Sequence, residues 1–132
     1  MLLGLDLTEV DRVAAVLERH GKRFLDRVFR PGEIRTARRH PRAFAEHVAG
    51  RFAAKEAAMK ALGLGWRGIA FRDIEVGRDG RGKPRLAFHG RALERAQALE
   101  VRLAEVSITH GRDVAAAVVA LVTRQADPSA MG

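Results

Sequence analysis

The stretch "RFAAKEAAMKALG", Arg51 to Gly63, decides the fold of this 132-residue chain. Alanine and other good helix formers fill it, and a glycine stands where a helix would end. It also places three charged residues, Lys55, Glu56 and Lys60, among apolar side chains. We predict that it is the C-terminal part of a long helix, from Pro41 to Gly63, and that the helix packs against a sheet.

The charges on this helix have two interpretations. At about 100° per residue, one apolar stripe contains four residues, namely Val48, Phe52, Met59 and Leu62. Lys55 lies within the stripe, and Lys60 follows Glu56 at the i,i+4 spacing that brings side chains together. In the simpler interpretation, Lys55 lays its stem over the core and Glu56 with Lys60 forms a surface ion pair of about 0.3–0.5 kcal/mol. The helix alone favours this interpretation.

The residues before the long helix predict a strand and further helices. Leu2–Leu7, "LLGLDL", reads as a short strand. Thr8–Gly21 has the apolar spacing of an amphipathic helix, which Thr8 can cap and Gly21 can end. Two short helical pieces follow, the second beginning near Pro31.

After Gly63 the pattern changes from helical spacing to alternation. A loop is followed by a hairpin (71–76 and 85–88) and a short helix (90–99). A second hairpin (101–110 and 114–122) comes last. This order predicts an α+β domain with a mainly antiparallel sheet packed against the long central helix. We expect one domain over residues 1–122 and a flexible C-terminal tail over 123–132.

The charge balance indicates an acidic partner. The chain has 24 Lys and Arg against 16 Asp and Glu, a net charge of +8. Most of the cations are arginines, whose planar fork suits phosphate and carboxylate groups. Nucleic acid, a phosphorylated cofactor and an acidic protein are all compatible with this charge. One Trp and no Tyr argue mildly against single-stranded nucleic acid, which stacks on aromatic rings.

Cysteine content and hydropathy exclude other classes. The chain has no cysteine, so it has no disulfide framework and no thiolate metal site, and a hard cation held by oxygen is favoured over zinc. No run of about 18 apolar residues is present, which predicts no membrane span and a cytoplasmic protein.

Asp6 stands out in the first strand, because a carboxylate in an apolar strand is costly unless something compensates it. Asp6 and Glu56 could share one Mg²⁺, which is typically held by one or two carboxylates and completed by water and substrate phosphates. Lys55, Lys60 and Arg51 would then neutralise phosphate charge. Alternatively, Asp6 caps the helix that follows the strand. The residues by themselves favour neither interpretation.

Four motifs in this order carry a family resemblance: "GLDLTEVDR", "GRFAAKEAAMKALG", "GKP" and "VSITHGRDVAAAVV". Together, from Leu3 to about Val122, they resemble the holo-[acyl-carrier-protein] synthase family of 4′-phosphopantetheinyl transferases and imply that fold. The resemblance implies Mg-dependent transfer of the phosphopantetheine arm of coenzyme A to a serine of acyl carrier protein, which is strongly acidic. Adenosine 3′,5′-bisphosphate would be released.

The resemblance also implies roles for single residues. Asp6 and Glu56 match the magnesium ligands, and Lys60 matches a lysine that contacts the phosphates; these three form the catalytic set. The attacking serine would lose its proton to Glu56 or to a water on the metal. Positions that shape or line the coenzyme A cleft are matched by Arg51, Lys55, Pro84, Ser107, Thr109 and His110. Arg12 and Arg23 match basic positions that engage the carrier protein.

The resemblance further implies a homotrimer with each active site between neighbouring subunits. The segment 114–122, "VAAAVVALV", is apolar on both faces, which fits either a strand packed against a partner subunit or a central strand covered by the long helix.

Other hypotheses remain for the basic residues. A small nucleic-acid-binding module would explain the charge but not Asp6 and Glu56. A non-catalytic subunit could dock an acidic protein through Arg12 and Arg23. His110 could simply make a local hydrogen bond. A basic run is either a solvated face or a landing surface for carrier protein or for the 3′-phosphate of coenzyme A; it contains Arg35, Arg38, Arg39 and Arg42.

Overall fold

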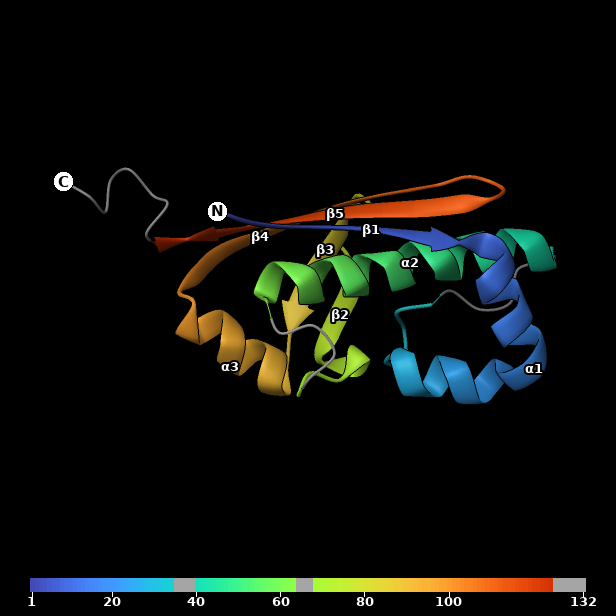
Figure 1. Cartoon of the computed structure of the whole chain (residues 1–132), viewed down its shortest axis with the longest axis horizontal. Coiled ribbons are helices and arrows are strands. Elements are labelled where there is room, and N and C mark those ends of the chain that lie inside the picture. Colours follow the sequence, from blue (N-terminus) through green and yellow to red (C-terminus); the bar gives the residue numbers. More distant parts are fainter. Residues whose placement is uncertain (35–39, 64–67, 125–132) are drawn as a thin grey trace.

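The computed structural model describes residues 1–34, 40–63 and 68–124 (Figure 1). The elements in chain order are β1 (Leu2–Glu9), α1 (Val10–Val28), α2 (Pro41–Leu62), the 3-10 turn η1 (Phe71–Asp73), β2 (Ile74–Arg78), β3 (Pro84–Phe88), α3 (Gly90–Ala98), β4 (Val101–His110) and β5 (Val114–Thr123). The long helix has the predicted bounds: it begins at Pro41 and ends before Gly63, which adopts the left-handed conformation (φ 76°) of a helix C-cap.

The strands form two antiparallel sheets, one of three strands in the order β1-β5-β4 and one made by the β2–β3 hairpin. In the larger sheet, Asp6 pairs with Ala117, which pairs in turn with Ile108. Helix α2 runs along one face of this sheet, and α1 and α3 lie on the same side of it (Figure 1). The predicted α+β class and the antiparallel sheet are therefore confirmed. Among the described helices, none is long and apolar enough to cross a membrane.

The contact between β1 and α2 is unusually close. Alternation along β1 turns Gly4, Asp6 and Thr8 toward the helix, where all three are buried. The facing stripe of α2 is made of fully or almost fully buried alanines, namely Ala53, Ala54, Ala57, Ala58 and Ala61. A Cβ atom on Gly4 would lie 1.8 Å from the carbonyl oxygen of Ala57. The strand and helix backbones thus meet directly, and only glycine fits at this point of β1.

Some local predictions differ from the structure. At Gly21 the prediction agrees with the structure: this residue is non-helical, with φ 17° and ψ −99°, and α1 consists of two helical segments that meet there at a kink. Thr8 does not cap α1, because the strand continues through Glu9 and the Thr8 hydroxyl donates to Asp6. Residues Phe71–Asp73 form a 3-10 turn rather than the start of a strand.

Several sequence predictions fall outside the described residues. The predicted helical piece beyond Pro31 has only a turn at its start, and its residues 35–39 are not described. Most of the predicted 64–68 loop and the tail from residue 125 onward also lie outside the described ranges.

The other face of the three-stranded sheet is apolar and uncovered. Leu3, Leu5 and Leu7 of β1 are 60–68% exposed there, beside Val118 of β5 and Leu103 of β4. No helix of the described part of the chain lies over this face (Figure 1). Strand β5 is apolar on both faces. Helix α2 covers one of them, and the other belongs to the uncovered surface. We call this uncovered surface the open face.

The backbone contact at Gly4 gives a first prediction. A Gly4→Ala substitution should lower the free energy of unfolding by about 3 kcal/mol or more, because the added methyl group meets a backbone carbonyl that cannot move aside. Gly77→Ala in β2 is the matched control, because nothing lies within 4 Å of a Cβ atom there. Urea denaturation of both variants checks the prediction, and equal midpoints would contradict the close packing of β1 on α2.

Candidate active site

A cleft of about 370 Å³ opens where β1, α1 and α2 meet. Asp6 and Glu56 line it together with Arg12, and apolar residues of α1 and α2, including Phe24 and Phe52, form its remaining wall. The two carboxylates that the sequence singled out therefore share one cleft, although 50 positions separate them in the chain.

Asp6 is held by its neighbours on both sides. Its side chain is only 8% exposed, and its Oδ1 accepts from the Lys60 ammonium at 3.0 Å. Its Oδ2 accepts from the Thr8 hydroxyl at 3.0 Å. Helix α1 has no side-chain cap, which removes the alternative role of Asp6 as a capping residue. Lys60 also donates to the carbonyl of Leu5 at 3.0 Å and is 55% exposed, so the ammonium bridges the strand and the solvent.

Glu56 is next to Asp6 in the cleft. Partial burial, and then the nearby Asp6 carboxylate, raise the pKa of Glu56, while the charge of Lys60 opposes the shift. The Glu56–Lys60 surface pair expected from their spacing does not describe this geometry, since Lys60 donates to Asp6 instead. A raised carboxyl pKa in a cleft is typical of a functional site.

This carboxylate pair fits a magnesium ion. Two neighbouring carboxylates supply hard oxygen ligands, and burial together with the nearby Asp6 charge raises the pKa of Glu56, a cost that a bound cation would offset. In the described ranges, no group of three or more His, Cys, Asp or Glu could hold a metal. The protein would thus contribute two ligands and leave the other positions to water and substrate oxygens, as Mg²⁺ commonly requires.

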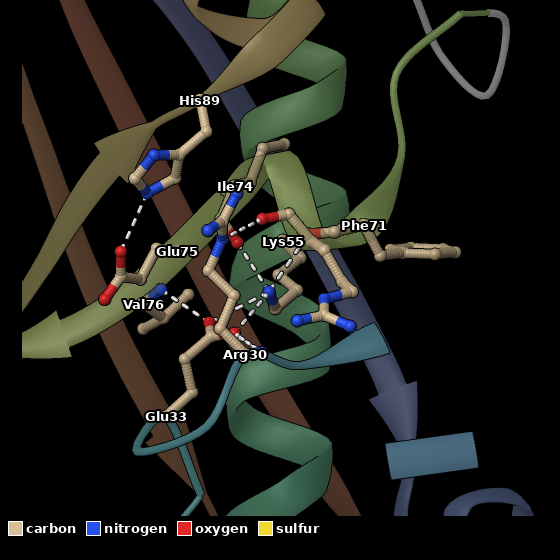
Figure 2. A network of polar contacts seen from close by, with 9 residues as sticks. Arg30, Glu33, Lys55, Phe71, Ile74, Glu75, Val76 and His89 are labelled. Carbon is tan, nitrogen blue, oxygen red and sulfur yellow. Dashed lines mark hydrogen bonds and ion pairs between the residues drawn. The ribbon is translucent and has the colours of Figure 1, made fainter. Parts of the chain in front are cut away.

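Lys55 lies elsewhere, inside the protein (Figure 2). Its side chain is fully buried, and its ammonium donates to Glu33, to the carbonyl of Phe71 and to the carbonyl of Ile74. Burial lowers the pKa of the Lys55 ammonium, and Glu33 opposes that shift. These three acceptors match the three N–H groups of the ammonium, so Lys55 is held inside the protein, and its expected phosphate contact stays a prediction.

Glu33 is the residue that sequence reasoning missed. It is 2% exposed and precedes the undescribed residues 35–39. Its Oε1 accepts from the backbone N–H of Val76 at 2.8 Å, and its Oε2 accepts from the backbone N–H of Arg30 at 2.6 Å. The only signal in the sequence is a lone acid beside a turn glycine, which is not specific.

The other residues expected at the coenzyme A cleft do not gather around Asp6 and Glu56. Pro84 and Ser107 line a second pocket of about 420 Å³, which includes Val118 and so lies against the open face. Thr109 lies two residues after Ser107 on the same face of β4 and is exposed. Asp6 belongs to the opposite edge strand of the sheet and faces α2. Within one chain the sheet therefore separates the two groups of residues.

His110 and Arg51 lie on the α2 side of the sheet. The Nδ1 atom of His110 is 3.5 Å from Oε1 of Glu46, a long local contact of the kind expected for a lone histidine at a strand end. Arg51 is 6% exposed on the buried side of α2.

The basic residues expected to meet a carrier protein lie on α1. Arg12 lines the cleft and its charge lowers the pKa of Glu56, opposing the effect of burial. Arg23 is exposed on the part of α1 beyond the kink. Arg42 of the basic run forms an ion pair with Asp11 at 2.6 Å and donates a hydrogen bond to the carbonyl of Arg112. The other members of the run, Arg35, Arg38 and Arg39, lie outside the described residues.

A comparison with protein families places this fold and cleft in a known group. Residues 2–119 match the family model described as the 4′-phosphopantetheinyl transferase superfamily. The chain belongs to this superfamily.

Curated and solved relatives agree with this assignment. The chain is 49% identical to a holo-[acyl-carrier-protein] synthase of Maridesulfovibrio salexigens, over 90% of this chain and 95% of the relative. The crystal structure of the Neisseria meningitidis holo-[acyl-carrier-protein] synthase aligns with a TM-score of 0.79 at 31% identity, covering 93% of this chain and all of that one. The Helicobacter pylori synthase in complex with coenzyme A aligns with a TM-score of 0.78 at 27% identity, covering 92% and 100%.

The chain is therefore an enzyme, a phosphopantetheinyl transferase, and the resemblance inferred from its four motifs is confirmed. Of the three hypotheses for its basic character, the comparisons favour the transferase over a nucleic-acid-binding module and over a non-catalytic docking subunit.

The raised pKa of Glu56 predicts how the stability of this transferase depends on pH. Because folding raises this carboxyl pKa, the contribution of Glu56 to stability is complete below its unfolded pKa and is lost as the pH rises through its folded pKa. In metal-free buffer, Glu56→Gln should therefore gain stability relative to wild type as the pH rises from about 4 to about 7.

Melting curves in a chelator at several pH values measure this difference. Glu94→Gln, on the exposed side of α3, is the matched control and should show no such pH-dependent gain. A constant difference between Glu56→Gln and wild type would contradict the raised pKa of Glu56.

Proposed function

We propose that this chain transfers the 4′-phosphopantetheine group of coenzyme A to a serine of an acidic acyl carrier protein. Magnesium is held by Asp6 and Glu56, and adenosine 3′,5′-bisphosphate is released. The observation that carries this proposal is that Asp6 and Glu56 line one cleft and that Lys60 contacts Asp6 directly. The relatives with about half of their residues identical bear the same activity in their names.

The reaction requires positioning and charge neutralisation more than covalent help from the protein. The serine oxygen attacks the phosphorus that carries the pantetheine arm, and the bond from that phosphorus to the adenosine bisphosphate breaks. When bound, magnesium neutralises the diphosphate oxygens and orients them. Lys60 is anchored to Asp6 and Leu5 but more than half exposed, which suits it to stabilise charge on the leaving phosphate. Glu56 is one carboxylate of the cleft that can accept the serine proton.

Arg12 at the cleft and Arg23 farther along α1 suit the binding of an acidic carrier protein. Both lie on the helix that forms one wall of the cleft, so a carrier bound along α1 would bring its serine to the two carboxylates. Exposed arginines attract an acidic partner at long range and are screened by salt, so binding should weaken as ionic strength rises.

A homotrimer with active sites between subunits is part of this proposal. The open face, with its three exposed leucines in β1, is an apolar surface of the kind that can mark a protein–protein interface. The pocket at Pro84 and Ser107 lies against the same face. In the proposed trimer this pocket of one subunit would lie beside the carboxylate cleft of a neighbour, which would unite the two groups of residues that one chain keeps apart.

The metal ligands give a direct test of the reaction. An apo acyl carrier protein incubated with this chain, coenzyme A and magnesium should gain the mass of one phosphopantetheine arm. Asp6→Asn and Glu56→Gln should each lower the rate by about 100-fold or more, because each removes a carboxylate that would neutralise phosphate charge. Glu94→Gln is the control and should keep the wild-type rate. Wild-type activity in both carboxylate variants would refute the two-carboxylate metal site.

The trimer has its own test. Leu5→Asp places a charge in the middle of the open face and should convert the trimer to monomers, as measured by light scattering, with loss of activity. Leu93→Asp is the matched control, because Leu93 is an exposed leucine of α3, away from the open face. A wild-type protein that is monomeric at working concentrations would contradict the shared active site.

A further inference from the structure

The buried ion pair between Glu33 and Lys55 joins three separate segments of the chain at one point (Figure 2). Lys55 comes from the middle of α2, and Glu33 from the turn after α1. The two carbonyls that complete the ammonium's shell, those of Phe71 and Ile74, come from η1 and the start of β2. Glu33 in turn accepts the backbone N–H of Val76 in β2. One salt bridge thus fixes α2 against the two segments that flank it on the side away from the sheet.

Stability alone is a poor explanation for this pair. Removing two charges from water is expensive, and well-packed apolar residues of the same size are often as stable as a buried ion pair. A buried pair does impose one geometry, because each N–H and each oxygen has a directional partner. Here the side chains of both residues are fully buried and the Lys55 ammonium also lies 5.0 Å from the centre of the Phe29 ring, so the pair has little freedom to move.

The pair adjoins the proposed metal ligand directly. Lys55 and Glu56 are consecutive on α2 and point in directions about 100° apart, so fixing the first fixes the azimuth of the second. A carboxylate at the tip of a helical side chain lies about 5–6 Å from the helix axis, so a rotation of about 10° moves it by about 1 Å. A misplacement of about 1 Å in an active site can cost about 100-fold in rate.

Neither residue reaches the cleft. Both Glu33 and Lys55 are absent from the residues that line the cleft around Asp6 and Glu56, and both are almost completely shielded from solvent. An effect of Glu33 on the reaction must therefore travel through α2.

We propose that Glu33 and Lys55 are a positioning pair, which holds the rotation of α2 so that Glu56 stands against Asp6 in the geometry that magnesium and the diphosphate require. This role rests on the magnesium site proposed above. It differs from the expectation that Lys55 itself contacts coenzyme A.

Steady-state kinetics of Lys55→Met and Glu33→Gln test the pair, with Glu94→Gln as the control for removing an acid. Each variant should lower kcat by about 10- to 100-fold while the KM for coenzyme A stays within about twofold, because the geometry of the metal site changes and no substrate contact is lost. The magnesium concentration for half-maximal rate should rise in both. The double variant should be no slower than the worse single variant, since both break one interaction.

Other outcomes overturn the proposal. If Lys55→Met raises the KM for coenzyme A and Glu33→Gln does not, Lys55 contacts the substrate directly. If folded variants keep the wild-type kcat and magnesium dependence, the pair has only a structural role. A wild-type enzyme that does not respond to magnesium at all would instead refute the metal site, which separates failure of the proposed function from failure of the positioning role.

A measurement on the wild-type protein covers the case in which both variants fail to fold. The chain has only four lysines, and Lys55 is the fully buried one, so its side-chain ¹⁵N signal can be separated from the others by slow proton exchange. The signal should keep its slow exchange when coenzyme A and magnesium are added. Its loss on adding coenzyme A would show that the ammonium leaves Glu33 for the substrate, and would overturn the proposal.

Discussion

The direct contact between the backbones of β1 and α2 is the constraint on which the rest of this structure depends. A side chain can rotate away from a close neighbour, but the carbonyl oxygen of Ala57 cannot, so the strand can approach only where it has no Cβ atom, at Gly4. The alanines of α2 serve the same purpose along the helix, since larger side chains would hold the strand away. Asp6 lies two residues after Gly4 on the same face of β1, and Glu56 and Lys60 flank Ala57. The core contact and the carboxylate cleft are thus built from neighbouring residues of β1 and α2. Close packing at the contact therefore also limits the movement of the cleft residues.

Lys55 and Lys60 show how position decides the role of a charge. Both are lysines of α2, five residues apart, and both bind a carboxylate. Lys55 points into the protein, where all its donors have fixed acceptors, and burial lowers its pKa. Lys60 is largely exposed beside Asp6, and its ammonium faces both that carboxylate and the solvent. Between them, Glu56 carries a raised pKa that no partner in the free protein fully compensates. Such an arrangement is costly for stability and useful for binding a cation, which is the usual compromise at functional sites.

Much of the fold can be predicted because its signals are local. The glycine after Leu62 and the alternation in β4 and β5 depend on neighbours a few residues away, so the predicted bounds of helix α2 and of the second hairpin agree with the structure within a residue or two. Gly21 acts locally as well: it interrupts the helical backbone of α1, and Phe24, Leu25 and Val28 in the segment beyond it pack into the same core cluster as the first segment.

The sequence by itself determined which side chains were candidates for chemistry. A carboxylate in an apolar strand and charges in an alanine-rich helix are costly wherever they fold, so the residue pattern marks Asp6, Glu56 and the lysines of this helix as candidates. The choice of Asp6, Glu56 and Lys60 as the catalytic set came from the family resemblance of the motifs. It could not determine that Lys55 binds Glu33, or that Ser107 faces away from Asp6 across the sheet. An apolar stripe predicts that a lysine is near the core, but a buried and a solvent-reaching ammonium give the same pattern. The choice depends on an acid 22 residues away and on two carbonyls from a third segment. Only the tertiary structure brings those groups together, because no local preference links residues that meet solely through packing.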